Sequence, residues 1–198
     1  MPPAIGILAL QGDFARHRSS FTALGAETRL VRRPSELAGC DGLVIPGGES
    51  TTLARLIHSG GLEQPLRAFA AERPVMGTCA GLILLARELA PEPGGDHGVT
   101  PLGLLACTVQ RNGYGRQVDS FSAPITMDAL NGSREPFLAV FIRAPRILAV
   151  DAEVEVIAAR AAEPVAIRQG HLLGLTFHPE LAHDARVHAS FLKMVTGR

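Results

Sequence analysis

Residues 75–82 read VMGTCAGL, and this stretch places a cysteine between two glycines where an apolar run gives way to a helical pattern. The pentapeptide GTCAG (77–81) has the form G-x-nucleophile-x-G, which between a strand and a helix is typical of a nucleophile elbow. Such a turn holds Cys79 above a sheet at a helix N-terminus, where the helix dipole and N–H groups favour a thiolate. On these five residues alone, a small buried thiol at a tight joint explains Cys79 equally well.

The chain around this turn alternates between strand and helix signals. Strands are expected at 4–10, 28–31, 42–46 and 74–77, and helices from Asp13 to Gly25 and over 51–60, 62–72 and 80–89. Alternating β and α elements predict an α/β fold whose central, mostly parallel sheet has helices on both faces.

The pattern changes after residue 90. A Gly/Pro-rich loop at 91–101 precedes strand-like runs that we interpret as antiparallel hairpins, at 102–109, 118–127, 137–142, 154–159, 164–168 and 172–177. A final amphipathic helix is expected over about 182–196. Because no linker or repeat interrupts the 198 residues, we expect one domain spanning 1–198.

Composition excludes several classes of function. Lysine plus arginine (19) equal aspartate plus glutamate (19), so no positive field favours nucleic acid as a partner. No apolar run approaches the roughly 20 residues that span a bilayer, and the N-terminus lacks a basic leader, so no membrane contact and a cytoplasmic location are expected. Three scattered cysteines without a CxxC pair argue against disulfides and a zinc site, and no metal or cofactor is expected.

A cysteine nucleophile needs a base and an orienting group, and the segment FHPEL (177–181) offers both. Pro179 keeps His178 extended, and residues two apart in an extended chain project to the same side, so His178 and Glu180 can face a common site. Cys79, His178 and Glu180 then form a candidate triad of nucleophile, general acid/base and imidazole orienter. Taken alone, His178 would more simply be a structural or surface histidine. The remaining histidines in helical or loop patterns are expected at the surface: His17, His58, His97, His183 and His188.

The segment PGGESTT (46–52) also follows a strand and precedes a helix. Its adjacent glycines allow close backbone approach, and N–H groups of Gly47 and Gly48 could complete an oxyanion hole with that of Ala80. A glycine-rich turn followed by a Ser50 or Thr51 N-cap explains the segment equally well locally. The lysine of a phosphate-binding P-loop is missing.

Together these residues resemble the triad class of glutamine amidotransferases, and more narrowly the glutaminase subunits of pyridoxal 5′-phosphate synthase. The narrower resemblance rests on LALQG (8–12), PGGESTT (46–52), GTCAGLILLA (77–86), RNGYGRQVDSF (111–121), FIRAP (141–145) and FHPEL (177–181). It implies a flavodoxin-like three-layer sandwich of the class I glutamine amidotransferase type. Small departures are Tyr114, Gly113 and the long 91–101 loop.

The resemblance implies that L-glutamine is hydrolysed to glutamate and ammonia without a cofactor. The ammonia would pass to a synthase subunit, in a large multi-subunit ring complex, that builds pyridoxal 5′-phosphate from a pentose phosphate and glyceraldehyde 3-phosphate. By the same resemblance, Cys79 attacks the amide, His178 moves protons and Glu180 orients His178. The implied glutamine-binding residues are Gly48, Glu49, Ser50, Arg111, Ile142 and Arg143. Gln11 and Gly12 would lie beside the oxyanion site and respond to docking of the synthase.

Two other functions fit parts of the pattern. A cysteine hydrolase or peptidase on a related fold would use the same elbow on a different substrate. A non-enzymatic binding or thiol-sensing protein would use Cys79 as an oxidisable group, with FHPEL as a mere turn.

Overall fold

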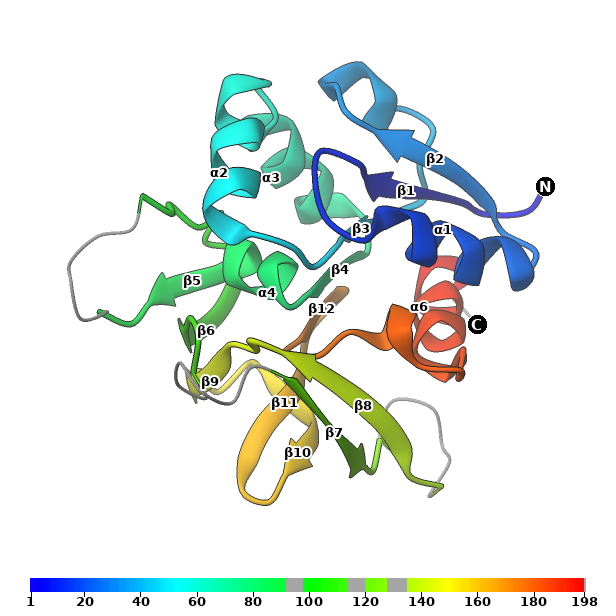
Figure 1. Cartoon of the computed structure of the whole chain (residues 1–198). Helices are drawn as coiled ribbons and strands as arrows, with labels where there is room; N and C mark the ends of the chain where they lie inside the picture. The colour runs from blue at the N-terminus through cyan, green and yellow to red at the C-terminus, as the bar shows by residue number, and fades with distance from the viewer. Residues whose placement is uncertain (92–97, 114–119, 128–134, 198) are drawn as a thin grey trace.

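The structure is a computed structural model that describes residues 1–91, 98–113, 120–127 and 135–197. Its centre is a seven-stranded sheet with the strand order β10-β11-β12-β4-β3-β1-β2 (Figure 1). Five neighbouring strands run parallel: β12 (Leu172–Leu175), β4 (Val75–Thr78), β3 (Gly42–Ile45), β1 (Ala4–Leu8) and β2 (Glu27–Val31). At one end of the sheet, β11 (Glu163–Gln169) pairs antiparallel with β12, and the edge strand β10 (Glu155–Arg160) pairs antiparallel with β11.

Helices cover both faces of this sheet, because successive strand residues point to opposite sides and both sides are apolar. On β3, Leu43 and Ile45 pack into one core cluster and Val44 into the other. The first cluster includes side chains of α2 (Ser50–Ser59), α3 (Glu63–Glu72) and α4 (Ala80–Leu85). The second includes side chains of α1 (Phe14–Ala23) and α6 (Arg186–Thr196). The expected three-layer α/β fold is therefore confirmed.

Two smaller sheets extend the outer layers (Figure 1). Strands β5 (Ala86–Leu89), β6 (Leu105–Gln110) and β9 (Arg146–Val150) form one, and their apolar side chains join the cluster of α2 to α4. Strands β7 (Ser120–Ile125) and β8 (Phe137–Ile142) form an antiparallel pair that joins the cluster of α1 and α6. The expected antiparallel pairing in the second half of the chain is confirmed.

The structure corrects several expected boundaries. The helix expected over 80–89 ends at Leu85, because Ala86 takes an extended conformation and starts β5, which pairs with β6. The last helix begins at Arg186 instead of 182, because a 3-10 turn, η2 (Pro179–Leu181), and an extended Ala182 precede it. A second short 3-10 turn, η1 (Pro34–Leu37), follows β2.

Besides β5, two features of the sheets were not predicted from the sequence. Strand β9 was not expected, and β12 was interpreted only as part of a hairpin, although it also pairs in parallel with β4. That parallel pairing brings the end of β12 next to the end of β4, so His178 follows one strand and Cys79 the other. Within the described residues, no helix is long and apolar enough to cross a membrane.

Candidate active site

Cys79 occupies a strained turn between β4 and α4. Its backbone has φ 49° and ψ −103°, a region that non-glycine residues rarely adopt and that is found at functional sites. Gly81 allows this turn to pack on the sheet, since a Cβ atom there would lie 2.0 Å from the carbonyl oxygen of Ile45. Cys79 is 6% exposed, and its thiol donates to the carbonyl oxygen of Ile142 at 3.8 Å. Ala80 begins α4, so its N–H is one of the donors that an α-helix leaves without an internal acceptor.

His178 and Glu180 lie between the end of β12 and η2. The backbone N–H of His178 donates to Val140 of β8 at 2.8 Å, which ties the residue to a neighbouring strand. Its Nδ1 lies 2.7 Å from Oε1 of Glu180, and both residues are buried. Because a carboxylate only accepts hydrogen bonds, the proton of this contact lies on Nδ1, and Nε2 remains for exchange with a thiol.

The surroundings favour a charged pair at this position. Burial alone would lower the pKa of His178, but hydrogen bonds with Cys79 and Glu180 outweigh burial and raise the pKa to about 10. Burial would raise the pKa of Glu180, yet hydrogen bonds from His17 and His178 hold it far below its ordinary value. A cationic imidazole next to a thiol is an arrangement that can activate a cysteine for nucleophilic attack.

The chain that leaves β1 lies directly against the PGGES segment. Oε1 of Gln11 accepts a hydrogen bond of 2.9 Å from the backbone N–H of Glu49. Gly12 has φ +94°, and a Cβ atom there would lie 1.8 Å from the carbonyl oxygen of Gly47. The two backbones can approach this closely only because position 12 is glycine.

The alternative explanation of this segment, an N-cap at Ser50 or Thr51, is not what the structure has, because Glu49 takes this position. The Glu49 carboxylate accepts from the backbone N–H groups of Thr51 at 3.1 Å and Thr52 at 2.6 Å. Burial would raise the pKa of Glu49, but these hydrogen bonds outweigh it and lower the pKa to about 2. Glu49 therefore remains ionised at neutral pH and caps α2, while still bordering the cavity beside Cys79.

A cavity of about 300 Å³ opens beside the thiol. Nine residues singled out from the sequence line it: Gln11, Gly48, Glu49, Ser50, Cys79, Arg111, Ile142, Arg143 and His178. Four others do not: Glu180 lies behind His178, and Gly12, Gly47 and Ala80 are adjacent to residues that do. Two further lining residues, Ile83 and Asn112, were missed. Ile83 was detectable, since it lies four residues after Cys79 and thus on the same helix face.

Two arginines bring positive charge to the cavity. The Arg111 Nη2 group donates to Oγ1 of Thr51 at 3.5 Å, and Arg143 has a positive φ of 42° directly after β8.

Tyr114, His97 and residues 92–97 of the long loop lie outside the described residues. Among the residues that are described, no three His, Cys, Asp or Glu side chains are grouped so as to hold a metal ion.

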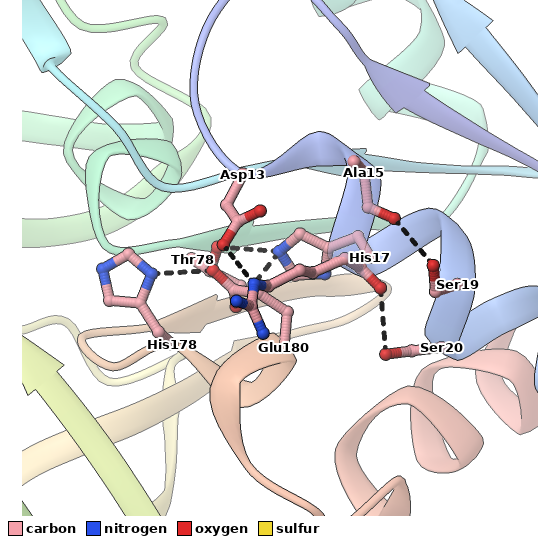
Figure 2. A network of polar contacts seen from close by, with 9 residues as sticks. Asp13, Ala15, His17, Ser19, Ser20, Thr78, His178 and Glu180 are labelled. Carbon is pink, nitrogen blue, oxygen red and sulfur yellow. Dashed lines mark hydrogen bonds and ion pairs between the residues drawn. The ribbon is translucent and has the colours of Figure 1, made fainter.

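Two histidines expected at the surface are buried instead. His17 on α1 and His188 on α6 are 0% and 1% exposed, because the two helices turn these residues toward the sheet and each other. His17 Nε2 lies 3.2 Å from Glu180 Oε2, and His17 Nδ1 lies 3.0 Å from His188 Nε2. Figure 2 shows Glu180 between His178 and His17. The expected exposure is confirmed for His58 and His183.

One family of known proteins matches almost the whole chain. The model of the SNO glutamine amidotransferase family matches residues 7–197. The pyridoxal 5′-phosphate synthase subunit PdxT of Mycolicibacterium vanbaalenii is 49% identical over 191 residues, covering 96% of each chain. The protein of the same name from Deinococcus radiodurans is 49% identical over 198 residues, covering 98% of each chain.

Solved structures agree with this similarity. A crystal structure of a glutamine amidotransferase superposes with a TM-score of 0.88 at 41% identity, over 97% of this chain and 98% of the other. The structure of PurLQS from Thermotoga maritima has a TM-score of 0.71 at 16% identity, over 97% of this chain and 98% of the matched chain. The second likeness concerns the fold alone.

Proposed function

The chain belongs to the SNO glutamine amidotransferase family, and from this premise we propose how it acts as the glutaminase subunit of a pyridoxal 5′-phosphate synthase. Its substrate is L-glutamine and its partner is a synthase subunit. Residues 1–198 act as one glutaminase domain, with Cys79, His178 and Glu180 as the triad. The observation that carries this assignment is the buried 2.7 Å contact between His178 and Glu180, directly beside the strained elbow of Cys79.

The chemistry follows from these positions. The Cys79 thiolate attacks the side-chain amide carbon of glutamine, and the backbone N–H groups of Gly48 and Ala80 stabilise the oxyanion. His178, which holds the thiol proton, gives it to the departing nitrogen, so ammonia leaves and a thioester remains. Water then gives a proton to His178 as it attacks the thioester, and glutamate leaves as Cys79 recovers its proton. Glu180 keeps the imidazole oriented and stabilises its charged form throughout.

The cavity suits an amino acid in size and charge. A volume of about 300 Å³ is at the lower end of the range for small-molecule sites. Arg111 and Arg143 offer charge-assisted hydrogen bonds to the α-carboxylate, while Glu49 and the carbonyl of Ile142 are acceptors for the α-ammonium group. Ser50 and Gly48 complete the proposed glutamine site.

The partner controls when ammonia is made. Gln11 and Gly12 follow β1 and contact the PGGES segment, so a synthase pressing on them would move the Gly48 amide relative to the oxyanion. Ammonia would then pass directly into a synthase that forms a large ring complex. Three unpaired cysteines suit the reducing cytoplasm as the location.

A glutaminase assay with and without the synthase subunit tests this function. We expect weak release of ammonia by the isolated chain, marked stimulation by the synthase, and none from Cys79→Ala, whose fold is checked by circular dichroism. Peptide cleavage is measured in parallel. Substantial activity in Cys79→Ala would refute the nucleophile, and peptide cleavage without glutamine turnover would favour a peptidase.

A further inference from the structure

His17 has no role in the mechanism described above. Its side chain is nevertheless fully buried, and its ring contacts Glu180 of the proposed triad. It lies on the first turn of α1, and its Nε2 is 3.2 Å from the Glu180 oxygen that does not contact His178. The same nitrogen is 3.4 Å from Oγ1 of Thr78, the residue before the nucleophile. One ring therefore contacts both chain segments that carry the triad, the end of β4 and the turn after β12 (Figure 2).

The chemistry of Glu180, His17 and His188 determines which residue donates and which accepts in each of their hydrogen bonds. The Glu180 carboxylate only accepts, so His17 carries a proton on Nε2 and donates it. His17 Nδ1 then accepts from Nε2 of His188, 3.0 Å away. Nδ1 of His188 then carries no proton, and this buried atom has no hydrogen-bond partner among the described residues. Burial and the neighbouring His17 lower the pKa of His188 to about 3, in keeping with a neutral ring.

We propose that His17, oriented by His188, is a positioning residue of the glutaminase: it donates to Glu180, keeps that carboxylate ionised and thereby holds His178 in line with Cys79. The proposal rests on the function proposed above. Oε2 of Glu180 is buried and makes no hydrogen bond of standard geometry among the described residues, but it forms the 3.2 Å ion-pair contact with Nε2 of His17. Without His17 it would be a charged atom with no donor, which is unfavourable. Protonation of Glu180 would relieve that cost, and a neutral Glu180 cannot stabilise an imidazolium.

The groups that determine the charge of Glu180 come from each packed element. Its own segment brings His178, α1 brings His17, and α6 brings His188 behind His17. Strand β8, which also packs on η2, carries no titratable side chain between Phe137 and Ile142. Asp13 and Arg16, at the start of α1, pair with each other at 3.1 Å with exposed side chains. Removal of His17 thus takes away one of the two side chains that lower the pKa of Glu180 by hydrogen bonding.

Two amide variants separate a donor role from a structural one. In His17→Gln the amide nitrogen reaches the position of Nε2, whereas in His17→Asn it reaches only that of Nδ1, so only Gln can donate to Glu180. Phe21→Leu is the matched control. Phe21 lies one turn further along α1, is also fully buried and packs on the His188 ring, but its side chain has no polar atom to offer Glu180.

The variants are assayed as complexes with the synthase, over a pH series. We expect His17→Asn to lower kcat by about 10- to 100-fold with little change in KM, the size of effect seen for groups that orient metal-binding histidines. Loss of the His17 donor raises the pKa of Glu180, so the acid limb of the kcat–pH profile should move upward. His17→Gln should recover most of the loss, and Phe21→Leu should lower Tm without moving the acid limb.

The rate at which iodoacetamide alkylates Cys79, measured over the same pH series, reports on the triad in the absence of glutamine. We expect its acid-side inflection to move upward in His17→Asn, as in the activity profile. A wild-type complex without glutaminase activity would refute the proposed function, whereas this alkylation profile tests His17 independently. The proposal would be overturned if folded His17→Asn kept the acid limb of the wild-type pH profile. It would also be overturned if the Asn and Gln variants had the same kcat and the same pH profile. If His17→Asn does not fold, His188→Phe replaces it, and an unmoved acid limb there would overturn the proposal equally.

Discussion

His178 and Glu180 form a buried contact of 2.7 Å between Nδ1 and Oε1, and both belong to the short turn that follows β12. The two residues are two positions apart in one turn and both are buried, so the local backbone and the packing around it hold the contact. We therefore expect this pair to act as one unit, in which Glu180 orients His178 and stabilises its charged form.

Replacement of Glu180 by Gln is expected to lower kcat far more than it changes KM. The variant keeps the shape of the side chain but removes the charge that stabilises the imidazolium, a loss that costs about 10⁴ in kcat in a comparable triad. Steady-state kinetics on glutamine give both constants, and His178→Asn is expected to be at least as severe. A large rise in KM with unchanged kcat would mean that Glu180 contacts the substrate instead.

A glutamine-mimicking diazo ketone is expected to label Cys79 and to spare Cys40 and Cys107. All three thiols are buried and unpaired, but only Cys79 borders the cavity. Burial raises the pKa of Cys107 to about 12 and raises that of Cys40, so both remain unreactive thiols. Peptide mass spectrometry identifies the labelled residue, with Cys79→Ala as the control. Preferential labelling of Cys40 or Cys107 would contradict the assigned nucleophile.

Substitution of Arg111 or Arg143 by Ala is expected to raise KM for glutamine. Each loses a charge-assisted contact of about 1.5–3 kcal/mol, which corresponds to roughly 10- to 150-fold in KM. Arg168→Ala is the matched control, because Arg168 pairs with Glu155 on the antiparallel edge and does not line the cavity. Affinity for the synthase is measured on the same variants. Weakened docking with unchanged KM would assign the arginines to the interface instead.

Gln11→Ala is expected to remove most of the stimulation by the synthase while lowering the basal rate far less. The substitution deletes the acceptor of the Glu49 N–H and so uncouples the chain after β1 from the segment that carries Gly48. One oxyanion donor is worth about 10²–10³ in kcat, so stimulation should fall by up to that factor. The assay compares kcat with and without saturating synthase. Full stimulation of Gln11→Ala would exclude this route of activation.

Local chemistry was accessible without the structure. The GTCAG pentapeptide needs only a strand before it and a helix after it to present Cys79, and His178-Pro179-Glu180 needs only an extended chain to align its two side chains. Alternation of apolar runs and amphipathic stretches was enough to predict the three layers.

The boundaries of helices and strands were harder to predict from the sequence, and the end of α4 shows why. The helix stops at Leu85 because the next residues, 86–89, pair with β6. Alanine has the highest intrinsic helix propensity, so Ala86 by itself favours continuing the helix. The strand that begins there depends on a partner almost 20 residues further along the chain, which local propensity does not reveal.

Tertiary packing sets what surrounds the triad. His17 and His188 are 171 residues apart and lie among polar neighbours, so the sequence predicts exposed residues, whereas packing of α1 against α6 buries both behind Glu180. The parallel pairing of β12 with β4 likewise joins distant segments and brings His178 to Cys79. The three layers could be predicted, and the candidate reactive groups proposed, because both depend on residue type and local periodicity. The partners of those groups depend on which distant surfaces pack together, and no local pattern carries that information.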